Sequence, residues 1–133
     1  MKNGFLKVAV TTPDLRVADC EYNKNQMVEK VKKMAGEKVS LVCFPEFSLT
    51  GYTCGDLFLH DTLVEGAKNA LAAYCEETKS YEIVSVVGLP LDHNGKLYNV
   101  AAVIYGGKIL GFVPKSYLPN YSCLLYTSPS PRD

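Results

Sequence analysis

An almost unbroken run of apolar residues from Val39 to Phe44 places the strongest constraint on the fold of this chain. A short run of this kind is typical of a β-strand that is covered on both faces of its sheet. Pro45 follows directly and ends the strand, because proline has no backbone N–H to donate to a neighbouring strand. A second run of the same type, Ile83 to Val87, predicts another buried strand.

Two further segments have the periodicity of helices. From Asn23 to Ala35 the apolar side chains recur on one helical face, and Gly36 is a natural stop. Thr62 and Glu65 fit a capping box, in which the side chain at the helix cap and the one three residues later bond each other's backbone N–H groups. The periodicity behind this box predicts a helix that runs to about Glu77.

The remaining segments complete a layered α/β arrangement. Residues Leu6 to Thr11 alternate like a strand, and after the turn at His93-Asn94-Gly95 a strand is predicted from Tyr98 to Tyr105. Gly106-Gly107 predicts a two-residue hairpin loop into a last strand from Lys108 to Val113. The predicted order is β-α-β-α-β-β-β, an α/β fold with at least one antiparallel hairpin and without internal repeats.

Composition and charge exclude several classes of protein. The chain has 133 residues, enough for one domain, with 14 Lys plus Arg and 14 Asp plus Glu. Zero net charge gives no reason to expect binding to nucleic acid or to an anionic membrane. No apolar run is long enough to span a bilayer, so the cytoplasm is the expected location. The five cysteines are odd in number and lack the spacing of metal or redox motifs, which favours reduced thiols.

The last twelve residues, Ser122 to Asp133, do not continue the pattern. They have no periodicity and are rich in serine and proline, which is typical of a flexible tail. The string also resembles a translated sequencing-adapter read-through. On that interpretation residues 1–121 are the natural part and residues 122–133 are a non-native tail without function.

Glu46 is the first candidate for chemistry. It lies just past the end of a predicted buried strand, where open α/β sheets place catalytic groups. Its apolar neighbours would disfavour the charged carboxylate and shift it toward use as a general base. From the spacing alone, a surface glutamate that follows a strand is an equally good interpretation.

Lys115 is the second candidate. It follows a predicted strand and Pro114, and a positioned ammonium there could stabilise a developing oxyanion. A solvated lysine is the commoner fate of this residue type.

Together the two motifs resemble the nitrilase superfamily, in which a Pro-Glu motif after a strand precedes a Pro-Lys motif after the next hairpin. The longer strings Gly55-Asp56-Leu57-Phe58 and Lys115-Ser116-Tyr117-Leu118-Pro119-Asn120-Tyr121 resemble one branch, the N-terminal amidase domain of glutamine-dependent NAD synthetases. The resemblance covers roughly residues 1 to 121. It implies an α-β-β-α sandwich, of which this chain would be the front half, and a Glu–Lys–Cys catalytic triad.

The resemblance also implies residue roles. Glu46 would be the general base and Lys115 would stabilise the tetrahedral intermediate. Tyr121 matches a tyrosine that contacts glutamine, and Tyr52 would line the same pocket. Neither histidine of the chain matches a catalytic position.

The nucleophile is expected to be missing. In this superfamily the cysteine lies on a later strand, so none of the five cysteines matches it: Cys20, Cys43, Cys54, Cys75 and Cys123. Cys43 is predicted to be a core residue of its strand, and Cys75 fits a helix face. We therefore expect the chain to be a truncated and inactive part of its parent.

For that parent, the resemblance implies that glutamine hydrolysis supplies ammonia to a C-terminal synthetase domain. There ATP and magnesium would support the amidation of deamido-NAD to NAD, within a homo-oligomer. No cofactor or metal is expected in this chain. In particular, it has no Gly-rich phosphate loop that could bind ATP. Two alternatives stay open: a free-standing nitrilase-type amidase or carbamoylase, and a fragment without catalytic activity.

Overall fold

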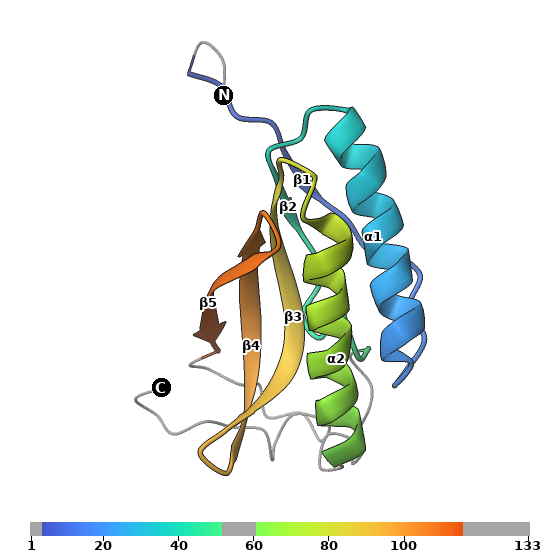
Figure 1. Cartoon of the computed structure of the whole chain (residues 1–133), viewed down its shortest axis with the longest axis vertical. Helices are drawn as coiled ribbons and strands as arrows, with labels where there is room; N and C mark the ends of the chain where they lie inside the picture. Colours follow the sequence, from blue (N-terminus) through green and yellow to red (C-terminus); the bar gives the residue numbers. More distant parts are fainter. Residues whose placement is uncertain (1–3, 52–60, 116–133) are drawn as a thin grey trace.

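The computed structural model describes residues 4–51 and 61–115, which form one mixed sheet covered on one face by two helices (Figure 1). The element order is β1 (Val8–Val10), α1 (Cys20–Gly36), β2 (Leu41–Cys43), α2 (Asp61–Thr78), β3 (Val84–His93), β4 (Lys96–Tyr105) and β5 (Lys108–Pro114). This is the predicted β-α-β-α-β-β-β order. It confirms the α/β class and supplies one helical layer and one sheet of the expected sandwich.

The strands lie side by side in the order in which they occur along the chain, from β1 to β5. β1, β2 and β3 are parallel, and each connection between them passes through a helix. β3, β4 and β5 are antiparallel. Two tight turns join them, and each turn carries two residues with positive φ: Asn94 and Gly95, then Gly106 and Gly107. Paired positive φ is the conformation that suits the twist of a two-residue hairpin.

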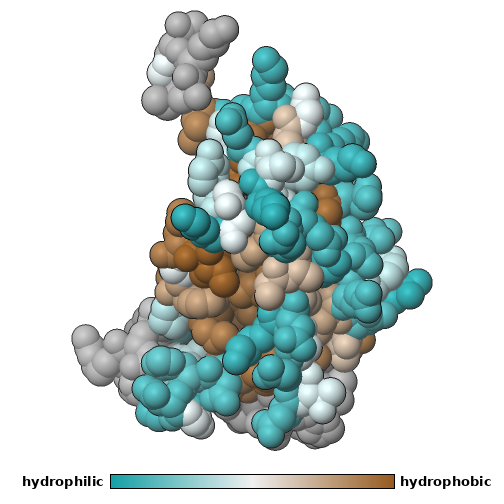
Figure 2. Space-filling view, in the orientation of Figure 1, coloured by the Kyte–Doolittle hydropathy of each residue, from teal (hydrophilic) through white to brown (hydrophobic). Residues whose placement is uncertain are grey.

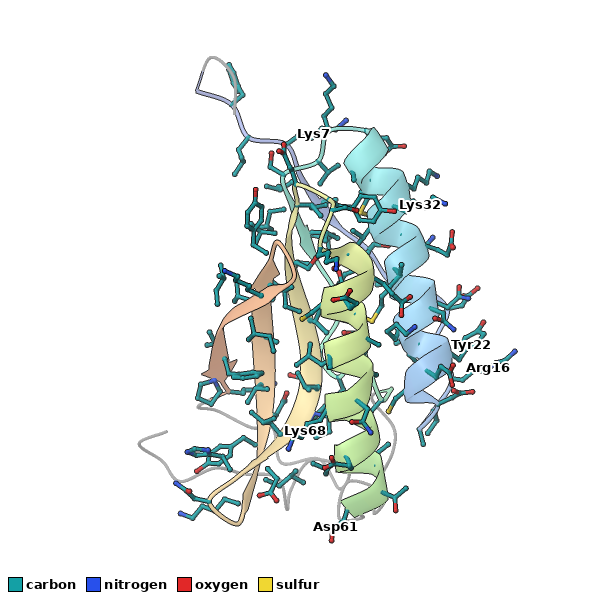
Figure 3. The ribbon with its side chains drawn as sticks, in the orientation of Figure 1. Lys7, Arg16, Tyr22, Lys32, Asp61 and Lys68 are labelled. Carbon is teal, nitrogen blue, oxygen red and sulfur yellow. The ribbon has the colours of Figure 1, made fainter. Side chains whose placement is uncertain are left out.

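Several predicted boundaries move for local reasons. α1 begins at Cys20 rather than Asn23, because the Asp19 side chain accepts a hydrogen bond from Tyr22 N and caps the helix three residues earlier. The Arg16 guanidinium stacks on the Tyr22 ring at the same end, 3.9 Å from its centroid (Figure 3). α2 begins at Asp61, so the predicted cap at Thr62 is wrong and that residue lies in the first turn.

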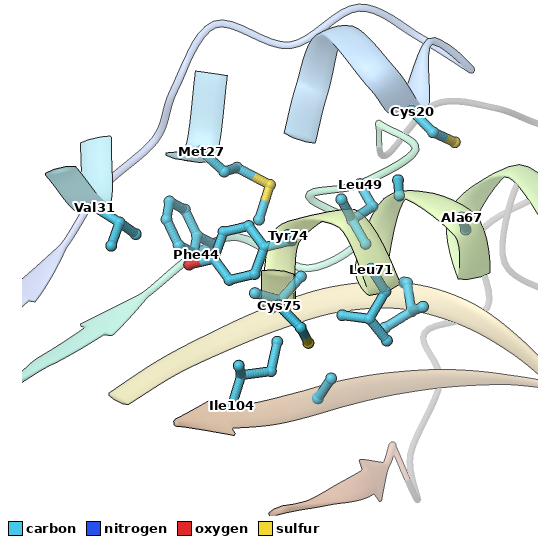
Figure 4. Close-up of a cluster of buried hydrophobic side chains, with 14 of the residues drawn as sticks. Cys20, Met27, Val31, Phe44, Leu49, Ala67, Leu71, Tyr74, Cys75 and Ile104 are labelled. Atoms are coloured by element: carbon cyan, nitrogen blue, oxygen red, sulfur yellow. The ribbon is translucent and has the colours of Figure 1, made fainter. Parts of the chain in front are cut away.

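The core lies between the helices and the sheet (Figure 4). Tyr74 of α2 is fully buried there, its hydroxyl donates to Ser85 Oγ on β3 at 2.7 Å, and its ring packs edge-to-face on Phe44. Burial raises the pKa of the Tyr74 hydroxyl well above its ordinary value of 10.0. Neither helix among the described residues is long and apolar enough to cross a membrane.

Among the described residues, no helix covers the opposite face of the sheet, which we call the open face. Side chains alternate between the two faces of a strand, and directly paired residues share a face. Val10, Cys43, Val86 and Val103 therefore line up across four strands on the face away from the helices. Val10 is 83% exposed. Figure 2 shows hydrophobic side chains gathered over the β4–β5 hairpin, where Ile109, Leu110, Phe112 and Val113 are exposed.

The buried phenol of Tyr74 predicts a loss of stability in alkali. Unfolding lets this group ionise near pH 10, whereas the folded protein keeps it protonated, so the unfolded state binds fewer protons and stability falls as pH rises above 10. Relative to wild type, we expect Tyr74→Phe to unfold more easily below pH 10, by about 1 kcal/mol for the lost hydrogen bond. This difference should shrink above pH 10, by up to about 1.4 kcal/mol per pH unit. Urea titrations from pH 8 to 12 measure it.

Ser85→Ala is the matched control, because it breaks the same hydrogen bond and keeps the phenol. Its alkaline loss of stability should follow that of wild type. A Tyr74→Phe curve that stays parallel to wild type from pH 8 to 12 contradicts the account.

Candidate active site

Glu46 is placed by a tight turn that ends β2. Phe44 N still bonds Val86 O at 3.0 Å, as a continued parallel strand would, and Pro45 then starts the turn over residues 46–50. Phe47 has φ 55°, an uncommon left-handed conformation for a residue with a side chain. Its ring is fully buried, so packing holds the backbone in this conformation. The turn therefore fixes the direction in which the neighbouring Glu46 leaves the sheet.

The start of α1 supports this turn from one side. The buried Asn23 side chain donates to Leu49 O at 3.1 Å and to Arg16 O at 2.8 Å. Ala18 N donates to Thr50 O at 2.7 Å. The bonds to Leu49 O and Thr50 O tie the turn to the start of α1 and satisfy two backbone carbonyls of the turn.

Lys115 is placed by the end of β5. Val100 of β4 pairs with Pro114, and Lys115 N donates to Asn99 O at 2.9 Å, so the pairing of the two strands continues to Lys115. In this register Asn99 and Lys115 are opposite each other, and their side chains are on the open face of the sheet.

Glu46 and Lys115 meet although 69 residues separate them. Lys115 Nζ donates to Glu46 Oε1 at 2.6 Å, and their side chains are 27% (Glu46) and 36% (Lys115) exposed. The two sequence candidates are thus brought together as a half-buried ion pair. A carboxylate can accept a proton here, and the adjacent ammonium can stabilise negative charge that develops on a neighbouring atom.

The ion pair borders a pocket of about 290 Å³ on the open face. Cys43, Val86, Ala101 and Val113 form part of its apolar wall. A concave apolar surface that carries a small number of polar groups is typical of a small-molecule site. The prediction of Cys43 as a core residue is wrong: it is only half-buried, because its strand position points away from the helices. Cys75 lies on α2, which confirms its predicted place on a helix, and it is buried there.

A larger groove of about 800 Å³ lies between α1 and α2. It holds a different ion pair, Lys24 Nζ to Glu77 Oε2 at 2.6 Å. The smaller pocket is the candidate active site, because there the carboxylate and the ammonium both follow strand ends and adjoin an apolar hollow.

The other predicted site residues, Tyr52 and Tyr121, lie outside the described residues, as do Cys54, Cys123 and His60. His93 is exposed at the β3–β4 turn, away from the ion pair. Within residues 4–51 and 61–115, no group of three or more His, Cys, Asp or Glu side chains could hold a metal ion.

Sequence reasoning missed Asn99. It is 3% exposed and lines the pocket, and its Nδ2 has no hydrogen-bond partner among the described residues. An asparagine within an otherwise apolar strand was the available signal, because a polar side chain at a buried strand position needs an explanation.

Known proteins are similar to this chain in sequence and in architecture. The chain is 37% identical over 120 residues to the glutamine-dependent NAD(+) synthetase of Mycobacterium tuberculosis, covering 90% of this chain and 18% of that protein. It is 34% identical over 118 residues to the corresponding enzyme of Aquifex aeolicus, covering 89% of this chain and 20% of that one. The chain thus spans less than a quarter of the length of these relatives.

Solved structures of known proteins are similar to this chain in their fold. The glutamine-dependent NAD(+) synthetase of Cytophaga hutchinsonii superposes with a TM-score of 0.81 at 27% identity, covering 86% of this chain and 20% of that chain. A mutant amidase of the nitrilase superfamily from Nesterenkonia has a TM-score of 0.78 at 17% identity, covering 94% and 48%, and supports the fold alone. The sequence profile of carbon-nitrogen hydrolases matches residues 7–131. The chain belongs to the carbon-nitrogen hydrolase family.

Proposed function

We propose that this chain is the front part of the glutamine amidohydrolase domain of a glutamine-dependent NAD synthetase. The observation that carries the proposal is the contact between Glu46 and Lys115 at the rim of an apolar pocket. The relatives at 37% and 34% identity support the choice of glutamine as the amide, because both bear the name of glutamine-dependent NAD(+) synthetase.

In this proposal the two side chains have complementary roles. Glu46 accepts the proton of the attacking thiol, passes it to the departing ammonia, and later accepts a proton from the hydrolytic water. The Lys115 ammonium, 2.6 Å from Glu46 in the resting site, stabilises the oxyanion of the tetrahedral intermediate. Tyr121 and Tyr52 would contact the glutamine. A longer protein would supply the nucleophilic cysteine and the synthetase domain that uses ATP and magnesium. That longer protein would also assemble into a homo-oligomer.

The first test replaces the proposed base in that longer protein. Glu46→Gln keeps the size of the side chain but cannot take up the proton, so glutamine hydrolysis should slow by about 10²–10⁴-fold. Ammonia release measures the rate. Glu76→Gln is the matched control, because Glu76 forms an exposed ion pair with Lys79 on α2, and its rate should stay within about twofold of wild type.

Glutamine hydrolysis that survives Glu46→Gln contradicts the assigned role. A longer protein that hydrolyses amides but does not form NAD from deamido-NAD and ATP would favour a free-standing amidase instead.

The second test uses the 133-residue chain alone. Because none of its cysteines matches the position of the family nucleophile, we expect no ammonia release from glutamine above the background rate. Cys43 is the described thiol that lines the pocket, so Cys43→Ser serves as the control. Turnover that is lost in both Cys43→Ser and Glu46→Gln would show that the chain carries its own nucleophile, against this prediction.

A further inference from the structure

Gly88 of β3 lies in close contact with the turn that carries Glu46. A Cβ atom added to Gly88 would lie 2.5 Å from Phe47 N and 2.8 Å from Pro45 O, and both are backbone atoms. Gly88 is not among the glycines with positive φ, so its backbone conformation is open to other residues. Glycine is therefore required here by the close approach of a second backbone segment.

Hydrogen bonds hold the same two segments together in both directions. Gly88 N donates to Ser48 Oγ at 3.0 Å, and Leu49 N donates to Gly88 O at 3.0 Å. β2 pairs with β3 only as far as Val86. Beyond that point the turn, and not β2, forms the hydrogen bonds to the backbone N–H and C=O of Gly88. Ser48 is fully buried, and its own N–H bonds Pro45 O within the turn at 3.1 Å.

We propose that Gly88 and Ser48 are positioning residues that set the location of the Glu46 carboxylate against Lys115. The inference rests on the function proposed for Glu46. Glu46 and Phe47 are joined by one peptide bond, so a shift that relieves a 2.5 Å contact at Phe47 N moves Glu46 as well. The backbone of Lys115 is held by its bond to Asn99 O of β4, so a shift of the turn that leaves the strands in place changes the geometry of the pair.

Gly88→Ala tests the steric part in the longer enzyme. A displacement of the order of 1 Å in a reacting group can lower the rate by about 10²-fold, so kcat should fall by about that factor with little change in KM. Gly111→Ala is the matched control: Gly111 is also a strand glycine without positive φ, but no atom lies within 4 Å of its added Cβ. It should keep kcat within about twofold of wild type.

Ser48→Ala tests the hydrogen bond from Gly88 N. It should lower kcat by about tenfold, because the turn loses the bonds that Ser48 Oγ makes to Gly88 and keeps the bond from Leu49 N to Gly88 O. Ser85→Ala is its control, since Ser85 also makes a buried hydrogen bond from β3 but faces the helices, and it should leave kcat within about twofold. Equal losses of kcat in Ser48→Ala and Ser85→Ala would show a general effect of destabilisation and overturn the proposal.

A double-variant cycle separates positioning from a merely structural effect. If Gly88 acts through Glu46, Gly88→Ala should lower kcat much less when Glu46→Gln is already present. A loss of kcat in the double variant that equals the product of the two single losses would contradict the proposal. A crystal structure of Gly88→Ala gives an outcome that does not depend on activity. A carboxylate displaced from Lys115 Nζ supports the role of Gly88 even if glutamine is not the substrate, and unchanged Glu46–Lys115 geometry refutes it.

Discussion

The pairing of β3, β4 and β5 decides where the two candidate catalytic side chains, Glu46 and Lys115, meet. Glu46 stands at the end of a parallel strand, whereas Lys115 stands at the end of an antiparallel one. These two ends coincide because β3 runs parallel to β2 and antiparallel to β4, and because β5 reverses direction once more. A register slip of one residue in either hairpin would move Lys115 to the helical face of the sheet. The contact between Glu46 and Lys115 therefore depends on the register of a sheet that is assembled from segments far apart in the sequence.

Stability alone does not explain the ion pair. Both side chains are about one-third exposed, and ion pairs this accessible contribute about 0–1 kcal/mol at most. The surrounding structure carries larger costs, including the left-handed backbone at Phe47 and the Nδ2 of Asn99, which has no partner among the described residues. Phe47 directly follows Glu46, and Asn99 lines the pocket. Strained backbone and imperfectly satisfied polar groups also occur at functional sites in other proteins. The hydrophobic packing of Tyr74, Phe44 and their neighbours on the opposite face offsets these costs.

Much of the fold could be predicted from the sequence. The apolar runs, the helical periodicity and the two glycine-containing turns depend on local physical chemistry, and they gave every element in the correct order. The boundaries were less accurate, because the cap at Asp19 depends on one side chain that reaches its own helix. The exposure of Cys43 could not be predicted from its apolar run, since only the alternation of the folded sheet shows which face lacks a helical cover.

The candidate site was predicted in part. The Pro-Glu and Pro-Lys motifs identified Glu46 and Lys115, but each alone was compatible with an ordinary surface residue. Their contact depends on strand register, and the sequence contains no signal for that distance. Gly88 illustrates the same limit. Its importance comes from a backbone that approaches it from another part of the chain, so no local pattern around Gly88 shows why a side chain is excluded.

The most direct test of the central claim is a structure of the longer enzyme with glutamine bound. The account predicts that the substrate amide occupies the pocket between the ends of β2 and β5. Its carbonyl oxygen should face the Lys115 ammonium, and the attacking thiol or water should lie between its carbonyl carbon and the Glu46 carboxylate. Glutamine bound in the groove between α1 and α2, or bound with Glu46 turned away from it, would contradict the assignment.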